Sequence, residues 1–149
     1  MYQYTLKELN KPEKGRHGEK LAKLKFRHYG FDIYTSKVFG KGLGFRIKKD
    51  DNYYDIKVRT LTKLDYVYLK KNTASLRDNL FVLWVLFNEG REPDFYLIPS
   101  TVWKKTNDVF VSRDYEGLIS DPEWGINISE KNLPELERYR FEKTISMIL

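Results

Sequence analysis

The sequence contains no cysteine and only two histidines. Without thiols there is no disulfide scaffold, zinc ribbon, iron–sulfur cluster or cysteine nucleophile. Long apolar runs are also missing: the longest, residues 80–87, is far too short to cross a bilayer, and the first ten residues lack the apolar centre of a signal peptide. We therefore expect a cytoplasmic protein that does not associate with membranes.

The 149 residues contain 41% hydrophobic and 15% aromatic side chains, which suffices for one packed domain over residues 1–149. Charge is spread unevenly along this domain. Residues 1–77 carry 19 Lys and Arg against 8 Asp and Glu, a net charge of +11, whereas residues 78–149 carry −5. A basic half can attract the phosphates of nucleic acid, although a solvated lysine-rich surface would have the same composition.

Hydrophobic periodicity predicts a helix over residues 13–29 that ends at Gly30. Alternating residues then predict a strand over 31–36, a hairpin of strands 43–49 and 53–60, and a short strand over 66–70. The apolar run over 80–87 is typical of a strand buried on both faces.

The remaining pattern predicts a strand over 95–99, a short helix capped by Ser100, and extended pieces over 109–114 and 125–129. A final helix is expected over 133–148, with Pro134 in its first turn. This order of elements predicts an α/β fold in which helices flank a mixed central β-sheet.

One strand of the hairpin carries the residues with the clearest chemistry. By alternation, Tyr54, Ile56 and Val58 face the core, while Asp55 and Lys57 share the other face about 7 Å apart. Such a pair suits metal-dependent phosphodiester hydrolysis, since a carboxylate can hold Mg²⁺ and an ammonium can orient the attacking water.

Three short motifs follow one another along the chain. They are Gly18-Glu19 in the first helix, Gly30-Phe31-Asp32-Ile33 at the opening of the first strand, and Asp55-Ile56-Lys57 in the hairpin. Their order is the same as in a known group of nucleases. A core strand over 80–87 and a step from strand to helix over 96–100 follow. Over residues 14–103 the chain thus resembles the PD-(D/E)xK, or restriction-endonuclease-like, nucleases, in particular small bacterial members of unknown function. Residues 104–149 form a C-terminal extension that ends in the expected helix.

This resemblance implies a restriction-endonuclease-like core and an endonuclease dependent on Mg²⁺ or Mn²⁺. Asp55 and Glu19 would hold the metal, and Lys57 would assist the attacking water. Contacts to the phosphates of DNA would come from the basic residues of the first helix and the hairpin, namely Arg16, Lys20, Lys23, Arg46, Lys48 and Arg59.

The metal site departs from the family pattern at Gly44. Active members carry an aspartate ligand at this position, whereas glycine offers no ligand and the neighbouring Arg46 would repel a cation. Asp32 is the nearest carboxylate that could replace it. We therefore expect an incomplete or inactive metal site, and whether the protein is an enzyme stays open.

Ordinary structural roles remain open for the same residues. Asp55 could pair with Arg46 or with the basic residues of its own strand, and Glu19 could be a solvated helix residue beside lysines. The tyrosines Tyr53, Tyr66 and Tyr68 could stack on bases or simply pack in strands. The leading hypothesis is a nuclease-like protein associated with nucleic acid. The alternative is a non-catalytic module that binds a protein partner or forms a homodimer.

Overall fold

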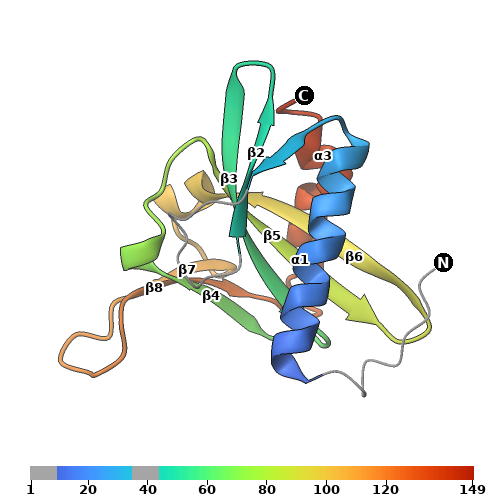
Figure 1. Ribbon diagram of the computed structural model, residues 1–149. Coiled ribbons are helices and arrows are strands. Elements are labelled where there is room, and N and C mark those ends of the chain that lie inside the picture. Colours follow the sequence, from blue (N-terminus) through green and yellow to red (C-terminus); the bar gives the residue numbers. More distant parts are fainter. Residues whose placement is uncertain (1–9, 35–43) are drawn as a thin grey trace.

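A computed structural model describes residues 10–34 and 44–149 and shows two β-sheets with flanking helices (Figure 1). The helices are α1 (Lys11–His28), α2 (Leu133–Leu136) and α3 (Phe141–Ile145), with short 3-10 helices η3 (Lys71–Thr73), η4 (Ser100–Lys104) and η5 (Glu137–Tyr139). The strands are β1 (Asp32–Tyr34), β2 (Gly44–Lys49), β3 (Asn52–Leu61), β4 (Tyr66–Lys70), β5 (Leu80–Asn88), β6 (Arg91–Pro99), β7 (Phe110–Arg113) and β8 (Glu123–Asn127). Residues 35 and 36 of the expected first strand lie outside the described ranges.

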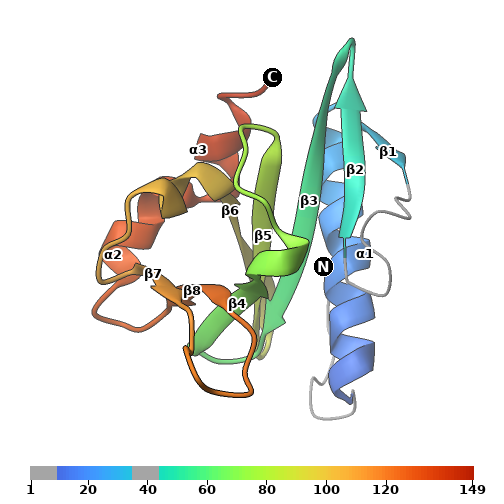
Figure 2. The same ribbon diagram turned by 90° about the vertical axis from the view of Figure 1, so that its left-hand side faces the viewer.

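The two sheets and α1 form layers. The five-stranded sheet has the order β1-β2-β3-β5-β6, and its β3–β5 pair is parallel while its other pairs are antiparallel. The expected mixed sheet of an α/β protein is thereby confirmed. One face of this sheet packs against α1 and α3, and the β5–β6 part of the other face packs against the three-stranded sheet β4-β8-β7 and α2 (Figure 2).

Helix α1 is set by its ends and by one apolar face. The Asn10 side chain accepts from the backbone N–H of Glu13 at 2.9 Å, and the Glu13 carboxylate accepts from the N–H of Asn10 at 3.0 Å, which is a capping box. The helix thus starts two residues earlier than expected, and it ends at His28, before Gly30 with its φ of +87°. Within the described ranges, no helix combines the length and apolar character that a bilayer span requires.

The β2–β3 hairpin places the motif residues in register. Its turn begins at Asp50, whose φ of 56° lies in the left-handed region that aspartate tolerates. Arg46 lies opposite Asp55, and Gly44 lies opposite Lys57. On the other side of β3, Asp55 is in register with Leu80 of β5. The motif carboxylate therefore stands in the middle of the sheet, between β2 and β5.

The crossover from β3 to β5 joins the two sheets. It contains β4, which pairs with β8 from the C-terminal part of the chain. The region that resembles a nuclease core and the C-terminal extension therefore share one sheet. The extension is an integral layer of the fold.

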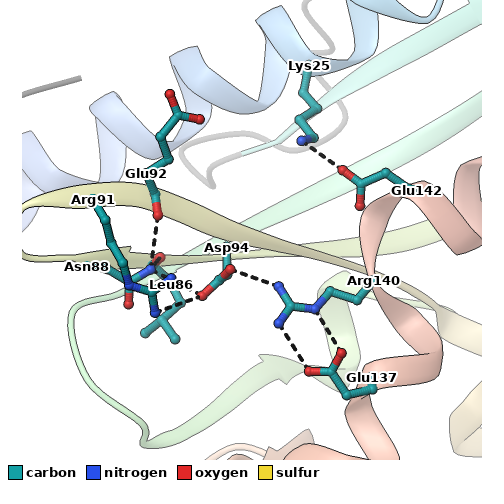
Figure 3. A network of polar contacts seen from close by, with 9 residues as sticks. All are labelled: Lys25, Leu86, Asn88, Arg91, Glu92, Asp94, Glu137, Arg140 and Glu142. Carbon is teal, nitrogen blue, oxygen red and sulfur yellow. Dashed lines mark hydrogen bonds and ion pairs between the residues drawn. The ribbon is translucent and has the colours of Figure 1, made fainter. Parts of the chain in front are cut away.

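The helix expected over residues 133–148 is wrong, because Arg140 interrupts it. Arg140 has φ −50° and ψ 140° and forms an isolated bridge with Tyr96 of β6. Its guanidinium donates to Asp94 at 2.8 Å and to Glu137 at 3.1 Å (Figure 3). Contacts with a distant strand thus accompany an extended backbone at Arg140, and the segment divides there into α2 and η5 on one side and α3 on the other.

The same network fixes the C-terminal segment on β6 and α1. Asn88 donates to Asp94 at 3.1 Å, and Lys25 of α1 lies 3.0 Å from Glu142 of α3 (Figure 3). Burial alone would raise the pKa of Asp94, but the hydrogen bonds from Arg140 and Asn88 outweigh it and lower that pKa. Asp94 is therefore a structural carboxylate that holds the last helices in place.

Candidate functional site

The candidate site lies on the face of β3 that points away from α1. Ile56 and Val58 join the core beneath α1, and alternation sends Asp55 and Lys57 to the opposite face. Both of these charged side chains are almost completely buried, with exposed fractions of 2% and 4%. Buried charge of this kind requires partners, so the contacts of each residue define what the site can do.

Two arginines hold both carboxylate oxygens of Asp55. Arg46 on β2 donates to Oδ1 at 2.8 Å and to Oδ2 at 3.3 Å, and Arg77 donates to Oδ2 at 2.6 Å. The ion pair of Asp55 with Arg46, which the sequence left open as an alternative, is present. Arg77 was not predicted. It lies just before β5, whose first residue is in register with Asp55, so a parallel β3–β5 pair is the signal that could have found it.

Ser100 fixes the loop that carries Arg77. The Ser100 hydroxyl donates to the carbonyl of Arg77 at 2.8 Å and accepts from its backbone N–H at 3.1 Å. The prediction that Ser100 caps the following helix is wrong, since the N-cap of η4 is Pro99 and no side-chain cap bond is present there. Ser100 instead joins the end of β6 to the loop before β5, and Arg77 is thereby held against Asp55.

Lys57 is a buried lysine among arginines. Burial is the largest effect on its pKa and lowers it. The nearby positive charges of Arg59 and Arg77 lower this pKa further, and the negative charge of Asp55 offsets part of the change. The native state therefore releases this proton at a lower pH than the unfolded chain does. Wherever the unfolded state binds more protons, the free energy of unfolding rises with pH. Lys57 thus contributes increasing stability between its lowered pKa and its ordinary value of 10.5.

The Lys57→Met variant tests this buried charge. We expect the wild type to gain stability relative to Lys57→Met as the pH rises towards 10.5, because only the wild type loses this buried ammonium. Urea unfolding at several pH values measures the difference, with Lys104→Met, an exposed lysine on η4, as the control. Parallel stability curves for wild type and Lys57→Met would contradict the assignment.

Glu19 is not brought together with Asp55 and Lys57. It belongs to α1, which covers the opposite face of the sheet, and its carboxylate lies 3.6 Å from Lys23. The α1–sheet contact is close at this point, since any side chain at Gly18 would collide with Thr60 of β3. Glu19 therefore pairs with a helix lysine, as the sequence left open, although its side chain is only 19% exposed rather than fully solvated.

The residues around Asp55 do not fit Mg²⁺ or Mn²⁺. These hard cations take near-octahedral sets of oxygen ligands, yet both oxygens of Asp55 are bound by guanidinium groups. Gly44 has no side chain, and Asp32 lies opposite Lys48, two residue pairs along β1–β2 from Arg46. Across residues 10–34 and 44–149, no group of three or more Asp, Glu or His side chains could hold a metal ion.

The six predicted phosphate-binding residues divide between two layers. Arg46, Lys48 and Arg59 lie on the same face as Asp55, and Lys48 is exposed there. Arg59 is half-buried and donates to the carbonyls of Tyr68 and Val58, so its charge is largely fixed by the fold. The other three lie on α1, namely Arg16, Lys20 and Lys23.

The predicted stacking tyrosines also divide. Tyr53 is 44% exposed beside the site, and the Arg46 guanidinium lies 4.1 Å from its ring centre. Tyr68 is 46% exposed on the second sheet. Tyr66 is engaged, since its hydroxyl donates to Glu123 at 2.5 Å. On the face of Asp55, exposed aromatic surface comes from Tyr53 and from Tyr34, which sequence reasoning missed.

Comparison with family models, with curated proteins and with solved structures finds no match for this chain. The interpretation of the site therefore depends on its own geometry. That geometry is one buried carboxylate bound by Arg46 and Arg77, with Lys57 nearby and with the exposed rings of Tyr34 and Tyr53 on the same face.

Proposed function

We propose that this protein binds nucleic acid on the open face of β1, β2 and β3, on a restriction-endonuclease-like core whose metal site is incomplete. The observation that carries the proposal is the charge around Asp55. Asp55 is already held by Arg46 and Arg77, and the same face adds Lys48 and Lys57 against one further carboxylate, Asp32. Such a surface favours phosphate over a divalent cation.

The order of elements supports the restriction-endonuclease-like part of the proposal. A helix precedes an antiparallel meander of β1, β2 and β3, and the D-x-K strand then pairs in parallel with the next strand of the sheet. The exposed rings of Tyr34 and Tyr53 add stacking surfaces beside the cations, as in proteins that bind single strands.

Salt dependence of binding tests the proposal. We expect labelled single-stranded and duplex DNA to bind at low salt, with affinity falling steeply as salt rises, because phosphate contacts release counterions. Replacing the exposed Lys48 with alanine should reduce the slope of log K against log salt for duplex DNA by about 0.9, the value for one lost phosphate contact. Lys104→Ala, an exposed lysine on η4, is the matched control and should leave the slope unchanged.

A cleavage assay with Mg²⁺ and with Mn²⁺ completes the test, and we expect no cutting of plasmid, linear duplex or single-stranded DNA. Cutting that Asp55→Ala abolishes would overturn the incomplete metal site. A flat salt response, or no binding, would overturn the assignment to nucleic acid.

One observation favours the alternative, a protein-interaction module. The loop between β7 and β8 projects from the molecule, and its Leu118 and Ile119 side chains are 68% and 103% exposed (Figure 1). Asp114 and Asp121 flank these residues, so the loop combines an apolar tip with acidic sides. Exposed apolar tips of this kind often contact protein partners.

A further inference from the structure

A second site lies beside the first half of α1. A cavity of about 790 Å³ is bounded by this half of the helix, the last residues of β3 and the β3–β4 loop. This volume falls within the range of small-molecule sites. The cavity is distinct from the Asp55 cluster, because neither Asp55 nor Lys57 lines it.

Beyond Lys57, β3 has no neighbour on its β2 side among the described residues. Strand β2 pairs with β3 only as far as Lys57, so in the described part of the chain Val58 to Leu61 have a sheet partner only in β5. These four residues form one wall of the cavity. The Thr60 hydroxyl is buried against Gly18 of α1, so the other residues of the lining provide the contacts for a ligand.

The cavity wall is strongly basic. Five cationic residues line it against the single carboxylate of Asp65, and they come from three separate segments: Lys11, Lys14, Arg16, Arg59 and Lys63. Because Arg59 donates to the carbonyls of Tyr68 and Val58, a ligand would meet mainly the lysines and Arg16. One carboxylate oxygen of Asp65 already accepts a hydrogen bond from the backbone N–H of Tyr66 at 2.7 Å. An excess of convergent cations in one concave site attracts an anion, and arginine in particular suits the geometry of phosphate.

Apolar surface lies next to these charges. Pro12, Leu61 and Tyr66 contribute to the lining. A small inorganic anion would leave this surface uncovered, whereas a phosphate attached to a ring system would contact both parts of the wall.

We propose that this cavity binds a phosphate monoester carried on a nucleoside, either a free mononucleotide or the phosphorylated end of a nucleic-acid strand. The phosphate contacts Arg16 and Lys63 at the rim, and the base lies against the apolar wall. The proposal does not depend on phosphate binding at the Asp55 face, because the two sites use different residues.

Calorimetry with three probes at low salt tests the cavity. We expect 5′-AMP to bind more tightly than adenosine and than inorganic phosphate, because only AMP contacts both parts of the wall. The double variant Arg16→Ala/Lys63→Ala removes two exposed rim cations and should weaken AMP binding about tenfold or more. The matched control is Lys104→Ala/Lys105→Ala, which removes the same charge from exposed positions outside the cavity and should have little effect.

Backbone amide shifts in NMR spectra locate the ligand. AMP should shift Gly15, Thr60 and Thr62, which line the cavity, and leave the amides of Arg46 and Asp55 unchanged. Absence of AMP binding, equal affinity for adenosine, or equal losses in the two double variants would each overturn the proposal.

Oligonucleotides separate the two sources of the ligand. If a strand end is bound, a 5′-phosphate raises the affinity of the wild type for an oligonucleotide but not that of Arg16→Ala/Lys63→Ala. If a free nucleotide is bound, AMP binds while the 5′-phosphate has no effect. The two proposals can fail separately. If Lys48→Ala weakens DNA binding but the wild type does not bind AMP, the cavity proposal is refuted and the proposed function is retained.

Discussion

Replacing Asp55 with alanine should lower the free energy of unfolding by about 2–4 kcal/mol and should strengthen binding to nucleic acid. Removing one partner of a buried ion pair commonly costs about 3–5 kcal/mol, because the remaining charge is left uncompensated. Here the side chains of Arg46 and Arg77 are 36% and 38% exposed, so water can solvate part of the remaining charge and reduce that cost. Lys57 stays buried and loses its nearby carboxylate, which preserves much of the penalty.

The effect on binding separates two roles for Asp55. If Arg46 and Arg77 face phosphate, removal of the carboxylate frees both guanidinium groups, and DNA affinity at low salt rises with a steeper salt dependence. If Asp55 is a metal ligand, the same change abolishes divalent-metal-dependent binding. Urea unfolding and fluorescence anisotropy measure the two quantities on one preparation.

Asp121→Ala is the matched control for Asp55→Ala. It makes the same charge change at a side chain that is 52% exposed and lies 3.4 Å from Lys70. Exposed pairs contribute at most about 1 kcal/mol, so we expect near-native stability and unchanged DNA binding. Equal effects of the two substitutions would mean that Asp55 acts only through overall charge.

Replacing Phe26 with alanine should lower the free energy of unfolding by about 3–5 kcal/mol, the usual cost of deleting a buried phenylalanine side chain. Phe26 is fully buried, and its ring lies 6.0 Å from Phe31, 5.8 Å from Phe45 and 5.0 Å from Phe141. This one side chain therefore joins α1 to the start of β1, to β2 and to α3. A typical domain has about 5–15 kcal/mol of stability in total, so the variant should be close to unfolding at 37 °C.

Leu24→Ala provides the control in the same helix, because Leu24 is 36% exposed and its truncation should change stability by no more than about 0.5 kcal/mol. Urea unfolding monitored by circular dichroism compares the two variants. A cost below about 1.5 kcal/mol for Phe26→Ala would mean that the core can close around the lost ring, contrary to the packing described above.

Local patterns predicted the elements that carry regular alternation. Period-two spacing in β2 and β3 correctly assigned Ile56 and Val58 to the core and Asp55 to the other face, because one register of a half-buried strand satisfies that pattern. The unbroken apolar run of β5 correctly indicated burial on both faces, and its residues alternate between the two cores.

What failed depended on contacts between distant parts of the chain. The final helix was overestimated because Arg140 meets Asp94, 46 residues earlier in the sequence, and no local signal records that contact. Arg77 was missed because it reaches Asp55 only through the β3–β5 crossover. The sequence predicted that Glu19 and Asp55 lie together in one metal site. This prediction failed because the apolar face of a helix does not determine which side of a sheet the helix covers.

The position of β4 decides where this chain can be shortened. A fragment that keeps the region resembling a nuclease core, residues 14–103, would retain β4 but lose β8, its hydrogen-bonded neighbour. Val67 and Leu69 would then be uncovered on a strand with unpaired backbone groups, which is a template for edge-to-edge aggregation. For expression or crystallisation, the boundaries should therefore retain β8, and the β7–β8 loop is the better place for an insertion or a tag.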